Sequence, residues 1–520
     1  MLSSVYSAGL AGIDGYIVTV ESDAKGNWPR FELVGLPDAA VKEAKERVRA
    51  ACENSGIRFP ETALTVNLAP ADRKKEGSAF DAAILCAILS SAGIINVDFS
   101  DKCIIGELSL SGELRSVRGI LCMCAAAKSA GMKEFYVPAV SAREAAAVEG
   151  IKVFPVENMR QLIDHFAGRA PIAPIEPDED RFSEATQSYS IDFSDVKGQY
   201  MAKRALEIAA AGGHNILLIG PPGTGKSMLA KRLPTILPTL TFDEAIETTK
   251  IHSVSGTLPE GTSLIKTRPF RSPHHTMSMV SLVGGGVNPL PGEISLSHNG
   301  VLFLDELPEF PKSITDSLRQ PLEDGKVTIT RASGRVTYPC SFMLVGAMNP
   351  CRCGYYGHPT KPCTCGAGER KRYMARISGP LLDRMDLHIE VPSLSYTDIS
   401  SKNENAETSE TVRRRVIAAR RFAQQRMKDS MYPIYCNAQL DAAGIRKYCV
   451  MDKAAEEFLG EAYVALGLSA RGYDRIMRVS RTIADLEGSE LIMMHHIAVA
   501  IRLRALDREQ EMKLCLPFGK

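Results

Sequence analysis

Short apolar runs recur in the middle of the chain and predict a buried sheet. Residues 216–219 read Ile-Leu-Leu-Ile, residues 301–304 read Val-Leu-Phe-Leu, and residues 342–345 read Phe-Met-Leu-Val. Strands covered on both faces show continuous runs of this kind, because the side chains of both faces are buried. Residues 228–233, shortly after the first run, have the apolar spacing that opens a helix.

The first part of the chain has a mixed pattern. Residues 15–21 alternate like a half-buried strand, residues 40–52 repeat apolar positions at helical spacing, and residues 64–68 are again strand-like. These patterns predict an α+β domain. Residues 168–180 are rich in Pro and acidic side chains, and polar residues continue to about Ser190, which is the composition of a linker.

A glycine-rich loop joins the first apolar strand to the helix that follows. It consists of Gly220, Pro221, Pro222, Gly223, Thr224, Gly225, Lys226 and Ser227. Such a P-loop directs backbone N–H groups and a helix N-terminus at one point and so forms an anion site. Lys226 is expected to reach the β- and γ-phosphates of a nucleotide, and the Ser227 hydroxyl to ligate Mg²⁺. A chance glycine-rich turn is the alternative, against which the flanking strand and helix argue.

The other two apolar strands end in polar residues. Asp305 and Glu306 follow the run 301–304 as in a Walker B motif, where Asp305 belongs to the Mg²⁺ shell and Glu306 orients and deprotonates the attacking water. Asn349 follows the third run at a position that resembles sensor 1 of AAA+ ATPases, from which it would place the water near the γ-phosphate. The alternatives are a strand end that meets solvent for the acidic pair, and a cap before Pro350 for Asn349.

Composition narrows the class of protein. The 520 residues suffice for several domains, and a net charge of +1 means that any nucleic-acid site has to be local. No apolar run approaches the length of a membrane span, and the first ten residues lack the basic region and long apolar core of an export signal. We therefore expect a cytoplasmic protein whose 13 cysteines are free thiols or metal ligands.

Two C-x-C pairs follow Asn349. Cys351 and Cys353 are separated from Cys363 and Cys365 by nine residues rich in Gly, Pro and Tyr. Four thiolates satisfy tetrahedral Zn²⁺ in a closed structural site, which leaves no open position for catalysis. His358 in the same loop is a substitute ligand in this hypothesis. The alternatives are a redox pair or four thiols without metal.

Four segments of the N-terminal part have distinctive sequences. They are residues 31–38 (Phe-Glu-Leu-Val-Gly-Leu-Pro-Asp), 67–72 (Asn-Leu-Ala-Pro-Ala-Asp), 75–81 (Lys-Glu-Gly-Ser-Ala-Phe-Asp) and 106–112 (Gly-Glu-Leu-Ser-Leu-Ser-Gly). They resemble the ComM/YifB family of magnesium-chelatase-like AAA+ ATPases, whose N-terminal domain is similar to the Lon protease domain, with the ribosomal S5 domain 2-like fold. A Lon-like peptidase would use Ser78, but Met123 stands at the position of the dyad lysine, so the hydroxyl has no base. Ser78 is therefore expected to be a turn residue.

After the linker the resemblance covers nearly all of the chain. It rests on residues 268–275 (Arg-Pro-Phe-Arg-Ser-Pro-His-His), 291–296 (Pro-Gly-Glu-Ile-Ser-Leu) and 299–310 (Asn-Gly-Val-Leu-Phe-Leu-Asp-Glu-Leu-Pro-Glu-Phe). It implies a multidomain α/β protein with four consecutive parts: a Lon-like domain (1–168), a linker (169–190), an AAA+ P-loop core with an insert in helix 2 and a pre-sensor 1 hairpin (191–393), and a C-terminal helical lid like that of magnesium chelatase (394–520). It also places His274 and His275 in the insert. We expect structural or pore-lining roles for them, because no carboxylate–His spacing completes a metal site.

Residues 325–338 predict a hairpin. Two alternating β-prone runs flank an Ala-Ser-Gly turn. In related MCM-like rings this hairpin projects into the central channel and contacts DNA, so Arg331 and Arg335 near the tip are expected to bind phosphates without reading sequence. The alternative is an exposed hairpin whose arginines only keep it soluble.

Two further arginines resemble parts of a ring ATPase. Residues 377–386 are similar to the family's arginine-finger segment, with Arg384 acting on ATP held by the neighbouring subunit. Residues 468–480 are similar to the lid helix of sensor 2, with Arg471 in that role. An ion pair at a helix end is the alternative for each. Residues 412–428 hold seven basic residues and no acidic one, which predicts a helix whose basic face is solvated or contacts another subunit. Contact with nucleic acid is the alternative.

The resemblance implies a function as well. It is that of a homo-hexameric ATPase that uses ATP and Mg²⁺ and acts on single-stranded or branched DNA without sequence preference, in branch migration or unwinding during recombination or natural transformation. The competing class is a protein-remodelling ATPase such as magnesium chelatase, to which a Lon-like N-terminal domain is foreign.

Overall fold

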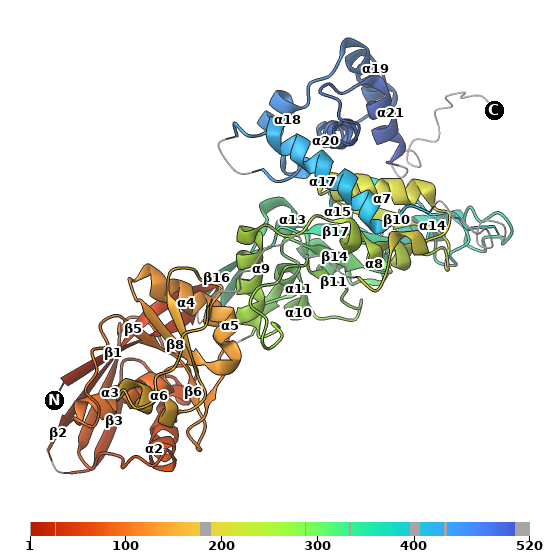
Figure 1. Ribbon diagram of the computed structural model, residues 1–520. Coiled ribbons are helices and arrows are strands. Elements are labelled where there is room, and N and C mark those ends of the chain that lie inside the picture. The colour runs from red at the N-terminus through yellow and green to blue at the C-terminus, as the bar shows by residue number, and fades with distance from the viewer. Residues whose placement is uncertain are drawn as a thin grey trace.

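The protein has three consecutive parts arranged along its length (Figure 1). The computed structural model describes residues 2–26, 28–176, 189–286, 288–331, 334–395, 406–430 and 434–504. An N-terminal sheet lies at one end, a parallel sheet lies in the middle, and a group of helices covers the other end of that sheet. The expected linker, residues 169–190, falls partly outside the described residues.

The N-terminal part is built on a seven-stranded mixed sheet. Its strand order is β3-β4-β2-β1-β5-β8-β9. The strands are β1 (Leu2–Ala11), β2 (Asp14–Lys25), β3 (Arg30–Val34), β4 (Ala63–Ala69), β5 (Lys102–Ile104), β8 (Glu134–Pro138) and β9 (Lys152–Val156), with a separate small pair β6 (Glu107–Leu108) and β7 (Leu114–Arg115). The helices are α1 (Ala39–Lys42), α2 (Ala44–Asn54), α3 (Asp81–Ser91), α4 (Ile120–Ser129), α5 (Ala142–Ala145) and α6 (Met159–Phe166).

The sequence patterns of this part correspond to elements of the sheet and its helices. The strand expected at 15–21 lies within β2, and the strand expected at 64–68 is the centre of β4. The helix expected at 40–52 is divided at Glu43, which ends α1 and precedes α2. Helix α3 is apolar on all sides because nearly all of it is buried against β1 and β2.

The middle part is a five-stranded parallel sheet in the order β11-β14-β17-β10-β18. Its strands are β11 (Phe270–Arg271), β14 (Val301–Leu304), β17 (Met343–Met348), β10 (Ile216–Ile219) and β18 (Leu387–Glu390). The surrounding helices are α7 (Tyr200–Gly212), α8 (Lys226–Ile236), α9 (Phe242–Ser255), α10 (Met279–Val283), α11 (Glu293–Leu296), α12 (Lys312–Ser317), α13 (Arg319–Asp324), α14 (Ala367–Met374) and α15 (Gly379–Leu382).

The three apolar runs form the three inner strands of this sheet, β14, β17 and β10. Ile216 and Leu218 point into a core shared with α7, α8 and the C-terminal helices, whereas Leu217 and Ile219 point into a core on the opposite face. Both faces are covered, and for this reason no polar residue interrupts the runs.

The insert, which lies between β11 and β14, packs against the hairpin that precedes β17. The hairpin consists of β15 (Lys326–Arg331) and β16 (Gly334–Pro339), and its turn residues 332 and 333 lie outside the described residues. The insert contributes the short pair β12 (Gly284–Gly285) and β13 (Leu290–Pro291). The buried Tyr338 hydroxyl donates to the carbonyl of Pro289 at 2.7 Å, which joins the two segments.

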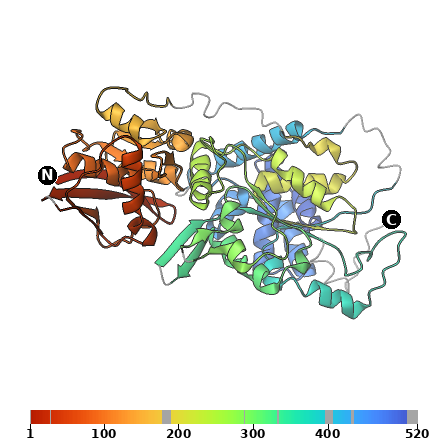
Figure 2. The ribbon, with the colours of Figure 1, turned by 90° about the horizontal axis from the view of Figure 1, so that it is seen from below.

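The N-terminal part meets the middle part at α9 and at the hairpin (Figure 2). The Glu144 carboxylate accepts hydrogen bonds from the backbone N–H of Leu121, at 2.8 Å, and from the Ser253 hydroxyl of α9, at 2.5 Å. Gly12, in the β1–β2 turn, lies so close to the hairpin that an added Cβ would be 2.7 Å from Cγ1 of Val336.

The C-terminal part consists of α17 (Ser409–Arg426), α18 (Ala442–Tyr448), α19 (Lys453–Ala465), α20 (Ala470–Leu486) and α21 (Met494–Arg502). The basic face expected for α17 is largely engaged inside the chain. Arg415 pairs with Glu207 of α7 at 2.5 Å, and Arg426 pairs with Asp485 of α20 at 2.6 Å. Arg420 donates to the carbonyl of Ala210 at 2.6 Å. The expectation of a solvated or intersubunit face was wrong for these residues, because their partners lie on helices distant in the sequence.

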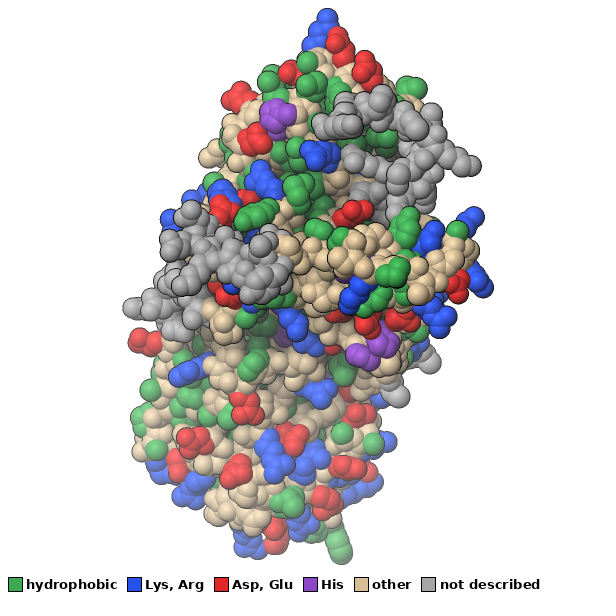
Figure 3. Space-filling model, turned by 90° about the vertical axis from the view of Figure 1, so that its right-hand side faces the viewer, with side chains coloured by type: hydrophobic (Ala, Val, Ile, Leu, Met, Phe, Trp, Pro, Cys, Tyr) green, Lys and Arg blue, Asp and Glu red, His purple; other side chains and the backbone are tan. Residues whose placement is uncertain are grey.

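The surface shows no extended field of one sign on the face drawn in Figure 3, where basic and acidic side chains are interspersed. This distribution agrees with the net charge of +1. Binding of a charged ligand therefore depends on local geometry. Within the described ranges, no helix combines the length and the apolar character needed to cross a bilayer.

Candidate nucleotide-binding site

The P-loop lies at the carboxyl end of β10 and leads into α8. Gly223 and Gly225 have φ angles of +79° and +88°, which side chains rarely adopt. Gly220 passes so close to the end of β18 that an added Cβ would lie 2.2 Å from the carbonyl oxygen of Val391. The glycines therefore permit the tight loop that turns backbone N–H groups toward an anion.

Lys226 lies in the centre of this loop. Its Nζ donates to the carbonyls of Gly220 at 2.7 Å and Pro221 at 2.8 Å, and to Oδ1 of Asn349 at 3.2 Å. Burial lowers the pKa of Lys226, while nearby Asp305 and Glu306 act in the opposite direction. The structure thus brings Asn349, from the end of β17, to the lysine expected to bind the terminal phosphates.

Ser227 and Asp305 are brought together by the sheet. The Ser227 hydroxyl donates to Oδ2 of Asp305 at 2.5 Å, although β17 separates the strands that precede these residues. A hydroxyl and a carboxylate beside a phosphate site are the hard oxygen ligands that Mg²⁺ prefers. The pair fits a magnesium–nucleotide complex.

Glu306 follows Asp305 in a left-handed conformation with a φ of +50°. Its carboxylate points toward the insert, where Oε2 lies 3.7 Å from Nδ1 of His275. Sequence reasoning placed His275 in the insert but did not connect it with Glu306, because nothing in the spacing indicates this contact.

Gln199 is a residue of the site that sequence reasoning missed. Its Nε2 donates to the carbonyls of Thr224 at 3.2 Å and Pro392 at 2.8 Å, so it fastens the P-loop to the chain after β18. Gln199 has a φ of +54° and directly precedes α7. The sequence gives no signal for this contact with the P-loop, because a Gly-Gln pair before a helix is not a recognisable motif.

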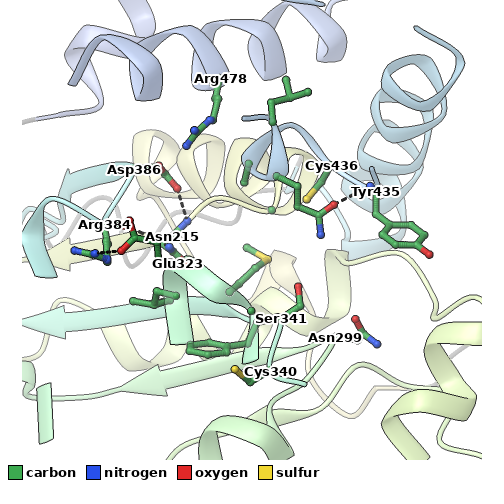
Figure 4. A pocket seen from close by; sticks show the side chains of 18 of the residues that line it. Asn215, Asn299, Glu323, Cys340, Ser341, Arg384, Asp386, Tyr435, Cys436 and Arg478 are labelled. Carbon is green, nitrogen blue, oxygen red and sulfur yellow. Dashed lines mark hydrogen bonds and ion pairs between the residues drawn. The ribbon is translucent and has the colours of Figure 1, made fainter. Parts of the chain in front are cut away.

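Arg384 and Arg471 lie at the opposite edge of the sheet from the P-loop. They line a cavity of about 590 Å³ between the middle and C-terminal parts, next to Asn215, Gly300 and Met343 at the amino-terminal ends of β10, β14 and β17. Figure 4 shows Arg384 and Asn215 in this cavity. Arg384 pairs with Glu323 and donates to the carbonyl of Pro380.

The distance across the sheet separates both arginines from their own P-loop. A strand of four residues such as β10 spans roughly 13 Å. Arg471 contacts only Asp383, at 3.9 Å, among the ion pairs of the described residues. Both arginines therefore lie at the end of the sheet away from Lys226 of the same chain.

Two more arginines of α20 line the same cavity. Arg475 and Arg478 follow Arg471 by one and two helical turns, a spacing visible in the sequence but not recognised there. Arg475 lies 3.8 Å from Asp386. Arg478 points from the helix toward the cavity, and its buried Nε has no hydrogen-bond partner among the described residues (Figure 4).

The four cysteines cluster as a metal site requires. Sγ of Cys351 lies 3.3 Å from Sγ of Cys353 and 3.6 Å from Sγ of Cys363, and all four ligand atoms, including that of Cys365, lie within 4.8 Å of one another. Tetrahedral Zn²⁺ with bonds of about 2.3 Å separates its sulfurs by about 3.8 Å. The cluster thus fits Zn²⁺. His358 is not part of it, since its Nδ1 accepts from the backbone N–H of Lys361 at 3.1 Å.

Arg331 and Arg335 lie near the hairpin end but on opposite faces. Thr330 pairs with Arg335 and Arg331 with Gly334, so the alternation of strands turns the two arginines to different sides. Arg331 lies against the insert, where a Cβ on Gly285 would be 2.9 Å from its Nη2. Arg335 shares its face with Thr330, Thr328 and Thr337, which is exposed.

The Ser78 hydroxyl, considered above as a nucleophile, donates to the Glu107 carboxylate, and Met123 is buried in α4.

The fold and the site together define a P-loop core of the AAA+ class. Residues 192–399 match the family model described as magnesium chelatase, subunit ChlI. Residues 20–141 match subunit ChlI of Mg-chelatase, and residues 406–504 match the C-terminal part of magnesium chelatase subunit ChlI.

Relatives extend the match over the whole chain. The chain is 41% identical over 522 residues to the competence protein ComM of Haemophilus influenzae, and 41% identical over 511 residues to the uncharacterized protein YifB of Escherichia coli, with 98% of each chain covered. It is 28% identical over 177 residues to the magnesium-chelatase 38 kDa subunit of Rhodobacter capsulatus, which covers 30% of this chain and 50% of that subunit. The chain therefore belongs to the ComM/YifB family of magnesium-chelatase-like AAA+ proteins.

Proposed function

We propose that the protein is an ATP-hydrolysing ring motor that acts on single-stranded or branched DNA. The observation that carries the proposal is the separation of Lys226 and Asp305, at one edge of the sheet, from Arg384 and Arg471, at the other. Hydrolysis that needs both sets of residues requires two chains, each completing the site of the next.

The residues at the carboxyl-terminal ends of the parallel strands have the chemistry needed to transfer the γ-phosphoryl group of ATP to water. Bound Mg²⁺–ATP supplies the phosphoryl group and the metal charge that offsets its negative charge. Lys226 binds the β- and γ-phosphates, and Ser227 and Asp305 hold the metal. Glu306 accepts the proton of the attacking water, and Asn349 orients that water. The products are ADP and phosphate.

The arginines at the amino-terminal ends of the parallel strands are placed to contact ATP that is bound to a neighbouring chain. Arg384 and Arg471 enter the neighbour's site, where positive charge stabilises the transition state and is worth about 10³–10⁵ in rate in other nucleotide hydrolases. A closed homo-hexamer satisfies this requirement for every chain with a single kind of interface.

The hairpin supports DNA as the substrate of the motor. Arg335 lies on its exposed face beside three threonines, and arginine and threonine side chains are donors to phosphate oxygens in protein–DNA contacts. The name of the Haemophilus relative, competence protein, supports a role in natural competence. Branch migration of recombining DNA is the activity that we propose for the motor in that role.

A protein-remodelling role is the second candidate, favoured by the match to magnesium chelatase subunits. The two candidates differ in their response to DNA. Forked or single-stranded DNA should raise ATP turnover of the motor and bind to it at low salt. A protein without affinity for either DNA at low salt would be a remodeller.

Substitution of the hairpin arginines tests the DNA contact. Arg335→Ala should weaken binding equally for all sequences and reduce the salt slope by about 0.7–0.9, since one phosphate contact is lost. Arg331→Ala should have the smaller effect, because that side chain lies against the insert. Arg421→Ala, at an exposed position of α17, is the control. Loss of DNA binding in the control alone would place the DNA site elsewhere.

A further inference from the structure

Asn215 lies where the strand that leads to the P-loop begins. It directly precedes β10, and its backbone carbonyl accepts from the N–H groups of Asp386 at 2.9 Å and Leu387 at 3.1 Å. These bonds extend the pairing of β10 with β18, which follows the segment that carries Arg384. The backbone thus fixes Asn215 beside the expected finger, and its side chain takes no part in that pairing.

The side-chain amide of Asn215 joins two other segments. Nδ2 donates to the backbone carbonyl of Arg384 at 2.9 Å, and Oδ1 accepts from the backbone N–H of Leu344 in β17 at 2.8 Å. A carbonyl needs a donor and an N–H group needs an acceptor, so the two partners also settle which way the amide is turned. Asparagine supplies one of each, whereas an ionised aspartate supplies acceptors alone and leucine supplies neither.

The residues after Arg384 are held independently of this amide. Oδ2 of Asp386 accepts from the backbone N–H of Asn215 at 3.0 Å, and Oδ1 of Asp386 lies 3.8 Å from Nε of Arg475 on α20. Figure 4 shows Arg384, Asn215 and Asp386 on the same side of the cavity. Loss of the bond from Nδ2 should therefore shift Arg384 while the position of β18 is kept.

The reach of the Arg384 side chain depends on the position of its backbone. The side chain is only 15% exposed, and its guanidinium donates to the carbonyl of Pro380 at 2.8 Å and pairs with Glu323. A finger that enters a neighbouring chain thus starts from a nearly covered position. Misplacement of a reacting group by about 1 Å can cost about 10²-fold in rate, so a small shift of this backbone has a large effect.

We propose that Asn215 is a positioning residue for the arginine finger, whose amide fixes the carbonyl of Arg384 to β17 and so sets where the guanidinium meets the ATP of the neighbouring chain. This inference rests on the proposed ring motor and adds a residue to the same reaction. Asn215 begins the strand that leads to its own P-loop, yet it acts on the site of the next chain. Its substitution should resemble a defect of the finger and not a defect of the P-loop.

The first test is steady-state ATP turnover of the full chain in mildly alkaline buffer, where an introduced carboxylate is ionised. Asn215→Asp keeps the acceptor for Leu344 and loses the donor for Arg384, so kcat should fall about three- to ten-fold, the factor that one net hydrogen bond supports. Asn215→Leu should show at least the same fall. The affinity for ATP in nucleotide titration should not change in either variant. A wild-type kcat in Asn215→Asp, or a loss of ATP affinity equal to the loss of kcat, would overturn the assignment.

Asn299→Asp is the matched control. Asn299 lines the same cavity, but its Nδ2 donates to the carbonyl of Glu244 at 3.4 Å and to the hydroxyl of Thr248 at 3.3 Å. The variant adds the same charge without a contact to the finger, so its kcat should be that of the wild type. An equal fall in both aspartate variants would assign the effect to charge in the cavity and would overturn the role of Asn215.

Mixed rings show on which site Asn215 acts. An Asn215→Asp chain has an intact P-loop and a displaced finger. Mixed with Lys226→Ala protein, it should exceed the average turnover of the two parents by about two- to five-fold, which random assembly gives for a defect of the size of one hydrogen bond. Mixed with Arg384→Ala protein, it should only match the average. The reverse pattern would show that Asn215 serves the P-loop of its own chain. If Asn215→Asp does not fold, Asn215→Leu takes its place with the same expected pattern.

A double variant separates this inference from the proposed ring. Without Arg384 there is nothing for Asn215 to position, so Asn215→Asp combined with Arg384→Ala should hydrolyse labelled ATP in single turnover at the rate of Arg384→Ala alone. If mixtures of Lys226→Ala and Arg384→Ala stay inactive while this equality holds, the division of the site between chains fails and the positioning of Arg384 stands. If those mixtures recover but the double variant is slower than Arg384→Ala, the ring stands and the role of Asn215 is wrong.

Discussion

Gly354, in the loop between the cysteine pairs, lies directly against Pro222 of the P-loop. A Cβ added to Gly354 would stand 2.6 Å from Cδ of Pro222, and Gly354 itself has a φ of +85°. The cysteine cluster therefore supports one wall of the phosphate loop. The geometry of the four sulfurs and the affinity for nucleotide should accordingly be linked.

Gly354→Ala is expected to weaken ATP binding by about five-fold or more, because the added methyl group displaces Pro222 at a cost typical of overpacking. Gly357→Ala is the control. Gly357 also has a positive φ, of +75°, but an added Cβ meets nothing within 4 Å, so backbone strain is matched while the contact is absent. Nucleotide titration of the two variants measures the difference. Equal affinities would show that the Pro222 contact does not shape the P-loop.

The cysteine cluster should bind about one zinc ion per chain, since four thiolates make one closed site. Cys363→Ser combined with Cys365→Ser should lose the metal, lower the thermal midpoint and weaken ATP binding through Gly354. Cys436→Ser, at a cysteine outside the cluster, should retain the metal. Elemental analysis of protein prepared without chelator or oxidant decides the matter, and zinc-free protein would refute the site.

Lys226→Ala should abolish ATP hydrolysis, because the terminal phosphates lose their cation. Glu306→Gln should keep ATP binding and stop turnover, since the amide cannot accept the proton of water. Binding and hydrolysis assays on both variants separate the two roles. Turnover of Glu306→Gln equal to that of the wild type would remove Glu306 as the base.

Mixing Lys226→Ala with Arg384→Ala protein should restore part of the activity, because some interfaces then combine an intact P-loop with an intact finger. The position of Arg471 predicts the same recovery for Lys226→Ala mixed with Arg471→Ala. ATPase assays of the mixtures, with proof that mixed rings form, provide the measurement. Mixtures as inactive as either parent would show that these arginines do not act between chains.

Glu144 should make the junction of the N-terminal part sensitive to pH. Burial raises the pKa of Glu144 above its ordinary value of 4.5, although Ser253 and Leu121 donate to it. The native state thus keeps a proton that the unfolded chain releases, and stability falls as pH rises from 4.5 to the raised pKa. The stability of Glu144→Gln does not fall in this way, because the amide does not titrate. Its thermal midpoint should therefore rise relative to that of the wild type as pH increases over the same range.

Glu144→Ala is the control for the hydrogen bonds themselves. It leaves the donors of Leu121 and Ser253 without an acceptor and should cost about 1–3 kcal/mol relative to Glu144→Gln at every pH. A midpoint difference between Glu144→Gln and the wild type that does not change with pH would contradict the assigned shift.

The sequence by itself determined the elements that depend only on residues close together in the chain. Residues 216–227 specify a buried strand, a glycine loop and a helix, because side-chain burial, positive φ and the helix start are all local properties. The same holds for the strand before Asp305 and for the two C-x-C pairs, whose short spacing already brings thiols together. Similarity to known proteins then placed these elements in one family.

Only the tertiary structure decided which distant side chains meet. The basic residues of α17 read as a free face, yet Arg415 and Arg426 find Glu207 and Asp485 on other helices. The contact of His275 with Glu306 depends on the pairing of β11, which precedes His275, with β14, which precedes Glu306. The separation of Arg471 from Lys226 depends on the direction of the parallel strands. Such contacts follow from packing between elements far apart in the chain, on which the local pattern of residues carries no information.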